Sequence, residues 1–311
     1  MHRGLAPLIS PVSPQEFMSA QWPKQPFVTH ELKIKTLTEL PFLQSLDALL
    51  KSWPHQVQVH LPDLADEASS VDASPADARK LFANKMPLLF NNVQNISPEL
   101  KNWLAALQAD LGLPAMTVGR CMIYATPHGK GTAPHFDQNV NFVLQIHGTK
   151  HWWLAPNSNV ENPTQRFTMG CAVDPELAAY VDSAMPEKMP DNEVEFVLKP
   201  GSMLFVPRGY WHRTKADTNA DAALALNFTF SQPTWVDLLT TALRSRLEQS
   251  AEWRELADGV SSQNPKLKAV AENKFNLLLA DLVSDLPNWQ AQDILGATEG
   301  AKHFLVAAVQ Q

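Results

Sequence analysis

The residues of this chain with the clearest capacity for chemistry are two histidines and one aspartate. His135 and Asp137 are separated by a single residue, and His212 follows far downstream. Two neutral imidazoles and one carboxylate form the three-ligand face that holds non-haem Fe(II) and leaves other coordination positions open. An isolated pair of this kind is more often two ordinary, partly buried side chains, because short motifs recur by chance. The surrounding residues therefore decide the interpretation.

The sequence around these three residues favours strands. Positions i and i+2 of a strand point to the same face, so His135 and Asp137 would project together. Pro134 and the nearby Gly131 suit the rim of a barrel. His212 follows a second hydrophobic strand, and we expect it to reach the metal from the opposing sheet.

Lys150 supplies a further observation. It lies in a predicted strand in which Trp152 and Leu154 share its face. A charge that is placed inside a protein needs a partner. A dicarboxylate co-substrate that chelates the metal at one end would provide that partner at its other end. The alternative is that the preceding turn directs Lys150 into solvent, which is the better interpretation of the lysine taken alone.

The elements that must position these residues begin with a helical portion, residues 1–116. Three predicted helices begin with the same capping pattern, a serine followed by a proline, at Ser13, Ser74 and Ser97. The hydroxyl caps the helix and the proline occupies its first position. Residues 41–53 also carry apolar residues at helical spacing. We therefore expect mostly helices here, with short strands between them.

From residue 117 onward the pattern becomes β-rich. We expect strands at 117–125, 141–147, 151–155, 193–198, 202–206 and 222–230. Gly148-Thr149 indicates a tight hairpin, and Pro200-Gly201 indicates another turn. Many short strands with closely spaced turns predict a barrel or a sandwich over residues 117–232.

The connection formed by residues 157–192 is long and polar. One helix is expected within it, over residues 175–184, with Asp174 as its cap. Connections longer than about 15 residues are often functional, so we expect this one to contact a substrate. The alternative is a plain surface excursion.

A second helical region, residues 233–311, follows the β-rich part. Thr234 and Asp237 match a capping box. Apolar residues recur at helical spacing after it, and residues 265–286 carry a second apolar stripe. Such faces must be buried somewhere, either on the barrel or against a second copy of the chain. We therefore divide the chain into residues 1–232 and a helical region, residues 233–311.

Composition limits the class of protein. The 311 residues are 45% hydrophobic and 18% charged, as in a soluble globular protein. A net charge of −7 argues against a general nucleic-acid-binding face. No apolar run suits a membrane span or a signal peptide. Cys121 and Cys171 form no disulfide framework, so we expect reduced thiols and a cytoplasmic location.

Two stretches of the chain resemble a known family. Residues 132–152 and residues 200–212 closely resemble the JmjC-type, cupin-like 2-oxoglutarate oxygenases. They are most similar to the ribosomal-oxygenase branch with its bacterial relatives, and they also resemble the asparaginyl hydroxylase that inhibits hypoxia-inducible factor. The resemblance implies a mainly β core, a double-stranded β-helix of the cupin or jelly-roll type, that holds Fe(II) and 2-oxoglutarate. It also implies a helical N-terminal elaboration and a C-terminal helical dimerisation unit.

The resemblance assigns roles to individual positions. His135, Asp137 and His212 match the iron ligands. Lys150 matches the basic residue that pairs with the distal carboxylate of 2-oxoglutarate, and Thr132 falls where a hydroxyl can hydrogen-bond the same carboxylate.

Three further positions have weaker assignments. Asn141 and Asn227 match polar positions that line the co-substrate pocket of the asparaginyl hydroxylase, although ordinary strand polarity would look the same. Tyr124 lies on the strand that leads into the site, where a core tyrosine is an equal alternative.

The function that the resemblance implies is an Fe(II)/2-oxoglutarate-dependent dioxygenase that hydroxylates a protein or peptide side chain and releases succinate and CO2. A ribosomal protein is one candidate substrate, and a homodimer through the C-terminal helices is expected. The ribosomal oxygenases carry a winged-helix domain after those helices. Only about 25 residues follow Pro287 here, fewer than an ordinary domain needs, which weakens the expectation of a ribosomal substrate.

Other functions would use some or all of the same residues. A small-molecule hydroxylase or a demethylase would share every residue named above. A non-catalytic metal-binding cupin would have no need of an inward-facing lysine, and a dimeric scaffold would have no need of His, Asp and His at these positions.

Overall fold

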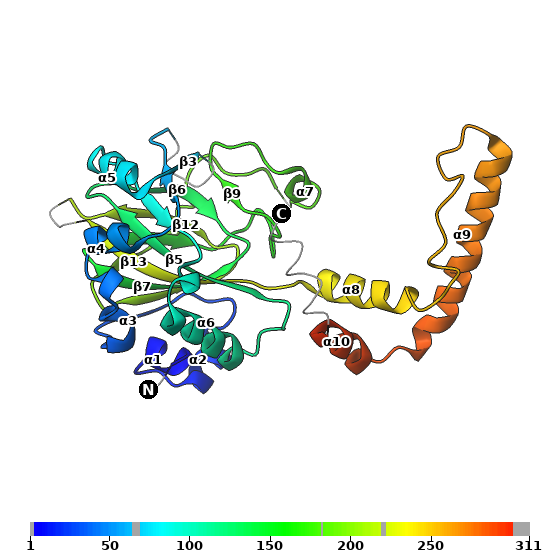
Figure 1. Cartoon of the computed structure of the whole chain (residues 1–311), viewed down its shortest axis with the longest axis horizontal. Coiled ribbons are helices and arrows are strands. Elements are labelled where there is room, and N and C mark those ends of the chain that lie inside the picture. Colours follow the sequence, from blue (N-terminus) through cyan, green and yellow to red (C-terminus); the bar gives the residue numbers. More distant parts are fainter. Residues whose placement is uncertain (1–2, 64–68, 182, 219–221, 301–311) are drawn as a thin grey trace. The chain divides into compact units, whose positions relative to one another are not determined.

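The computed structural model in Figure 1 describes residues 3–63, 69–181, 183–218 and 222–300. The chain forms two compact units. One consists of Met1–Leu113 with Val118–Ser231, and the other of Pro114–Thr117 with Gln232–Gln311. The last part of the expected helical region, residues 301–311, lies outside the described residues.

Two antiparallel sheets make the β core of the first unit. The larger has eight strands in the order β1-β11-β7-β13-β5-β4-β2-β3, and the smaller has five in the order β10-β8-β12-β6-β9. The strands are β1 Phe27–Thr29, β2 Val57–His60, β3 Ser70–Ala73, β4 Leu88–Phe90, β5 Val118–Thr126, β6 Gly131–Phe136, β7 Val140–His147, β8 Lys150–Ala155, β9 Phe167–Thr168, β10 Val194–Leu198, β11 Met203–Val206, β12 Trp211–Ala216 and β13 Ala223–Ser231. Strands β1 to β4 belong to the N-terminal portion, so that portion also extends the larger sheet.

The helices of the first unit begin where their caps predict. Ser13, Ser74 and Ser97 each accept a hydrogen bond from the backbone N–H three residues later, at 3.2, 3.2 and 3.3 Å. The helices are α1 Leu5–Ile9, α2 Pro14–Ala20, α3 Lys35–Thr38, α4 Leu46–Ser52, α5 Pro75–Ala83, α6 Pro98–Asp110 and α7 Pro175–Ala178, with 3₁₀ turns η1 Pro41–Leu43 and η2 Val93–Asn95. Apolar residues of α1, α2, α4 and α6 pack in one cluster with Phe142, Phe205 and Phe228 of the larger sheet.

The expected hairpin at Gly148-Thr149 is wrong. β7 belongs to the larger sheet and β8 to the smaller one, so this turn carries the chain from one sheet to the other. Pro200-Gly201 does the same between β10 and β11. Gly148 has φ 67° and Gly201 has φ 84°, which suits glycine in both turns. A turn signal predicts a local reversal but not the strand that becomes the hydrogen-bonded neighbour, which explains the error.

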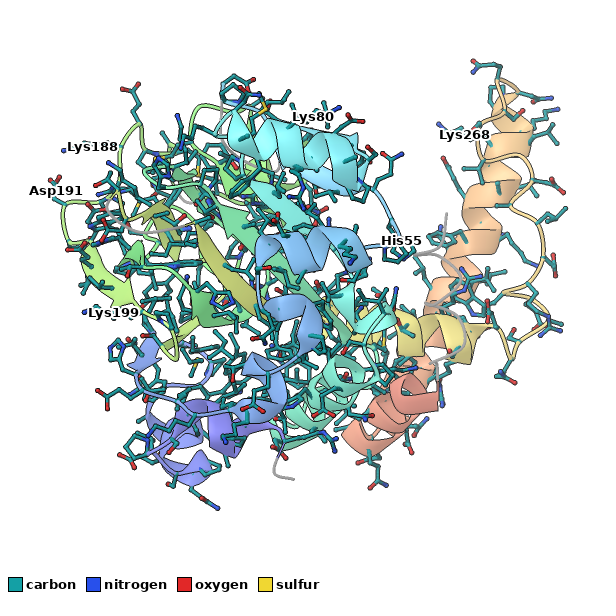
Figure 2. The ribbon with its side chains drawn as sticks, turned by 60° about the vertical axis from the view of Figure 1, so that its left-hand side comes forward. His55, Lys80, Lys188, Asp191, Lys199 and Lys268 are labelled. Carbon is teal, nitrogen blue, oxygen red and sulfur yellow. The ribbon has the colours of Figure 1, made fainter. Side chains whose placement is uncertain are left out.

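The segment 157–192 connects β8 to β10, which are neighbours in the smaller sheet. It contains β9 and α7, and Asp174 caps α7 by accepting from the N–H of Glu176 at 2.8 Å. The helix is shorter than expected, because it ends at Ala178. Lys188 and Asp191 of this segment pair at 2.9 Å on the outside of the unit (Figure 2).

The second unit contains α8 Trp235–Leu247, α9 Pro265–Asp285, η3 Leu286–Asn288 and α10 Ala291–Gly300. The capping box of Thr234 and Asp237 is present. α8 buries Leu238 and Ala242, whereas Val236 and Leu239, which recur at helical spacing, are exposed. α9 has 21 residues and buries none of them. Within the described residues, no helix combines the length and apolarity needed to cross a bilayer.

Candidate active site

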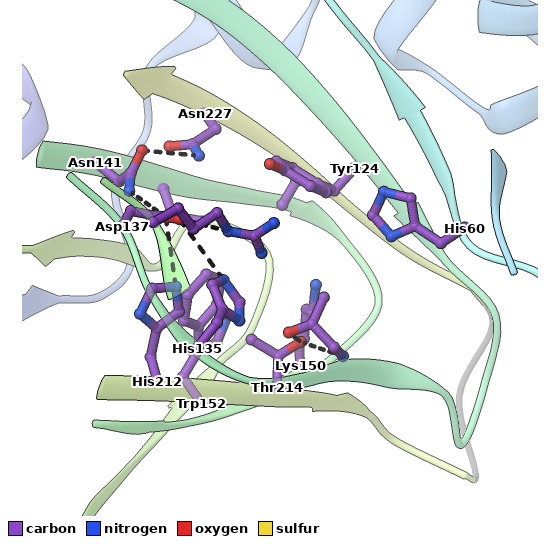
Figure 3. A pocket seen from close by; sticks show the side chains of 14 residues that line it. His60, Tyr124, His135, Asp137, Asn141, Lys150, Trp152, His212, Thr214 and Asn227 are labelled. Atoms are coloured by element: carbon purple, nitrogen blue, oxygen red, sulfur yellow. Dashed lines mark hydrogen bonds and ion pairs between the residues drawn. The ribbon is translucent and has the colours of Figure 1, made fainter. Parts of the chain in front are cut away.

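His135, Asp137 and His212 converge between the two sheets (Figure 3). Nε2 of His135 lies 4.0 Å from Asp137 Oδ1, and Nε2 of His212 lies 3.7 Å from Oδ2. All three ligand atoms lie within 4.8 Å of one another, a spacing that could hold a metal ion.

His212 reaches this site by a different route from the expected one. It is the register partner of His135 on the adjacent strand of the same sheet, so the prediction of an opposing sheet is wrong. The strand that the sequence reading missed is β12, which begins at Trp211 and continues beyond the histidine. The expected strands include none between 206 and 222, because the short polar stretch of residues 212–216 carries no strong strand signal.

Hydrogen bonds determine the tautomer of both histidines. Nδ1 of His135 lies 2.7 Å from the carbonyl oxygen of Ala133, and Nδ1 of His212 lies 2.9 Å from that of Tyr210. A carbonyl oxygen only accepts, so Nδ1 carries the hydrogen in each ring and Nε2 offers a lone pair. In the neutral rings, two Nε2 lone pairs and a carboxylate converge, which suits a bound cation, and the donor set fits Fe(II).

An irregularity in the pairing of β6 with β12 turns a second side chain of β6 into the site. His212 faces His135, but Thr214 faces Thr132, so two steps on β12 oppose three on β6. Residues three apart on a regular strand point to opposite faces, and the extra residue of a bulge brings both inward. Thr132 Oγ1 lies 2.9 Å from Thr214 Oγ1. A Cβ on Gly131 would lie 1.7 Å from the carbonyl oxygen of Thr214, so the close approach of these strands requires glycine.

Lys150 is buried in the same pocket, with 3% of its surface exposed. Its Nζ donates to Thr126 Oγ1 at 3.1 Å and lies 5.8 and 5.5 Å from the ring centres of Tyr124 and Trp152. In the described part of the chain, no carboxylate forms an ion pair with it, and burial lowers the pKa of Lys150 to about 8. The alternative of a solvent-directed lysine is therefore excluded.

Asn141 and Asn227 project into the pocket from the larger sheet. Asn141 Nδ2 donates to Asp137 Oδ2 at 3.2 Å, and Asn141 Oδ1 accepts from Thr229 Oγ1 at 2.7 Å. This chain of bonds connects β13 to the candidate metal ligand. Asn227 Oδ1 and Trp152 Nε1 are buried with no hydrogen-bond partner among the described residues, which suits a pocket built to receive a polar molecule.

Residues that the sequence reading did not assign to the pocket also line it. Thr214 and Trp152 do so from the smaller sheet, and the Trp152 ring stacks on His212 at 5.7 Å. His60 comes from β2, where the sequence gives no local signal. Arg166 comes from the 157–192 segment, and its Nε donates to Asp137 Oδ1 at 3.0 Å. The expectation that this long connection is functional was the one indication of Arg166.

Comparison with known proteins agrees with this geometry. The family model described as the JmjC domain matches residues 106–238. The uncharacterized protein YxbC of Bacillus subtilis is 35% identical over 292 residues, which are 91% of this chain and 86% of YxbC. The chain belongs to the JmjC family. Its β core, two antiparallel sheets with helical segments, is the JmjC and cupin-like core.

More distant JmjC relatives are named ribosomal oxygenases. Ribosomal oxygenase 1 of Gallus gallus is 26% identical over 261 residues, which are 80% of this JmjC chain and 41% of the relative. The JmjC chain therefore spans less than half of that protein. The X-ray structure of ycfD from E. coli has a TM-score of 0.54 at 18% identity and covers 91% of this chain and 69% of ycfD. At that identity the likeness concerns the fold.

Proposed function

We propose that this chain is an Fe(II)/2-oxoglutarate-dependent dioxygenase that hydroxylates a protein or peptide side chain and releases succinate and CO2. One observation carries the proposal: a buried lysine that pairs with no carboxylate of the described residues lies in the same pocket as two histidines and an aspartate. A dicarboxylate that binds the metal at one end would supply the missing partner at the other. A metal-binding cupin without this co-substrate would gain nothing from burying Lys150.

The residues divide the work as follows. His135, Asp137 and His212 would hold Fe(II), and Lys150 with Thr132 would anchor 2-oxoglutarate. Iron and 2-oxoglutarate supply the oxidising chemistry with O2, whereas the protein orients the reactants and excludes water. Structures of ycfD are described in complex with cobalt and succinic acid and with cobalt and 2-oxoglutarate, which supports this assignment by analogy.

A protein or peptide substrate is favoured by the names of the relatives and by the 157–192 segment, which reaches the pocket through Arg166. A ribosomal protein is accordingly the first candidate to test. The two free cysteines suit a cytoplasmic location.

The test needs no substrate. Purified apo-protein is titrated anaerobically with Fe(II) and then with 2-oxoglutarate, and the weak visible charge-transfer band of the chelate is recorded. We expect a saturable band. Iron binding without a band would reject 2-oxoglutarate and leave the metal-binding cupin, and the absence of iron binding would reject the metal site itself.

The second unit leads to a linked proposal, a homodimer. α9 buries no residue and exposes Val270, Phe275, Leu277 and Val283 by more than half of their surfaces. Exposed apolar residues of this number are typical of a protein–protein interface, and a second copy of the chain could cover them. We expect light scattering at micromolar concentration to give the dimer mass, and Leu277→Glu to shift it toward the monomer mass. A monomeric wild-type chain would contradict the proposal.

A further inference from the structure

Arg166 forms an ion pair with the aspartate of the candidate metal site. Its Nε lies 3.0 Å from Asp137 Oδ1, and the two side chains are 20% and 21% exposed. The other oxygen of Asp137 accepts from Asn141 at 3.2 Å. The carboxylate therefore has one charged and one neutral donor.

The position of Arg166 is tied to the strand that carries the site. It immediately precedes β9, in which Phe167 is the register partner of Phe136 and Thr168 that of His135. Arg166 is thus placed beside the metal ligands by strand pairing and not only by a surface loop.

The pocket contains two cations at different places. Figure 3 shows Lys150 on the side of Tyr124 and His60, away from Asp137 and the two histidines. Arg166 lies against Asp137 itself. With neutral histidines, Asp137, Lys150 and Arg166 give the described lining side chains a net charge of +1, in a chain whose net charge is −7. A divalent metal would raise the charge to +3, and a dianionic ligand would return it to +1.

A metal ion would also weaken the existing pair. Once Asp137 shares its charge with a dication, the guanidinium loses part of its counter-charge at the moment when an anion enters the pocket. Arginine is well suited to exchange one carboxylate for another, because its donors lie in a planar fork.

We propose that Arg166 is a second anion-binding residue of this site, which stabilises the 2-oxo-acid end of the co-substrate while Lys150 stabilises the distal carboxylate. This inference rests on the proposed function, since it assumes that a 2-oxo dicarboxylate binds here. It assigns the 157–192 segment a role in binding the co-substrate beside the metal.

The experiment compares 2-oxoglutarate with pyruvate, which has the 2-oxo-acid end but lacks the distal carboxylate. Both are titrated anaerobically into the Fe(II)-loaded protein, and the charge-transfer band gives each Kd. Arg166→Gln keeps an amide donor and removes the charge, so we expect both ligands to bind about 10-fold more weakly. Lys150→Ala should weaken 2-oxoglutarate alone. Arg166→Lys, which keeps the charge, should lie closer to wild type for both.

Arg208→Gln is the matched control. Arg208 donates to the carbonyl oxygens of Pro163 and Asn162 in the same segment, at 2.8 Å each, so its loss tests disturbance of the segment. Unchanged Kd values in Arg166→Gln would overturn the proposal. So would loss of Fe(II) binding itself in that variant, because Arg166 would then only hold Asp137. If wild-type protein binds iron but neither ligand, the proposed function fails first.

Discussion

Lys150→Met is expected to stabilise the ligand-free protein and to weaken 2-oxoglutarate binding by about 100-fold or more, because it removes a charge-assisted contact in a buried site. Burial lowers the pKa of Lys150 from 10.5 to about 8. A shift of that size corresponds to a cost on the order of 3 kcal/mol for keeping the lysine charged in the folded protein at neutral pH. Methionine has a similar length, carries no charge and adapts to its surroundings.

The stability difference between Lys150→Met and the wild type should change with pH in a defined direction. The folded-state pKa lies below the unfolded-state value, so the cost is fully present below about pH 8 and is relieved as the pH rises toward 10.5. The advantage of Lys150→Met should therefore be largest at pH 7 and shrink at pH 9 to 10. Urea denaturation of both proteins at each pH measures it. Lys199→Met, at a surface lysine, is the control (Figure 2). A less stable Lys150→Met protein at pH 7 would contradict the argument.

Asp137→Asn is expected to weaken divalent-metal binding by about 100-fold or more, since Asp137 is the one anionic ligand that the described residues offer to the site. The substitution preserves shape, but it leaves the Arg166 guanidinium without the carboxylate that it contacts at 3.0 Å. The charge beside the metal then becomes one unit more positive, while the Arg166 guanidinium stays in place.

Co(II) titration followed by visible absorption measures this loss without any co-substrate. Asp191→Asn, at an exposed ion pair with Lys188, should leave the Co(II) affinity unchanged. If Asp137→Asn bound Co(II) as tightly as wild type, the metal would have to lie elsewhere.

The parts of the fold that the sequence predicts well are those determined by neighbours along the chain. The serine caps and the capping box at Thr234 depend on contacts three residues apart, and all of them are present. The proximity of His135 and Asp137 is also local, although β6 ends at Phe136 and Asp137 lies just beyond the strand on which it was expected. Features that depend on pairing between distant segments were missed, namely the sheet to which β12 belongs and the two sheet-to-sheet turns.

The candidate site also combines features that depend on sequence neighbours with features that depend on the pairing of distant segments. Strict alternation would direct Thr132 away from His135, and only the register shift against β12 brings both into the pocket. His60 and Arg166 arrive from segments that are far apart in sequence, so no spacing rule connects them with the histidines. The role of Lys150 came from the family resemblance, because its apolar neighbours alone left the solvent-directed alternative open, and the three-dimensional structure excludes that alternative.

The 157–192 segment leaves the smaller sheet from β8 and returns to the neighbouring strand β10. Because β9 pairs with β6, the segment is fixed at Phe167 and Thr168, whereas residues before and after β9 can be inserted or exchanged while the strands that carry His135, His212 and Lys150 stay in register. During evolution, changes in this connection could therefore give a related protein a different substrate while the residues that carry out the reaction are kept. β9 limits that freedom, and under the proposed role of Arg166 a replacement segment would also have to place a guanidinium beside Asp137.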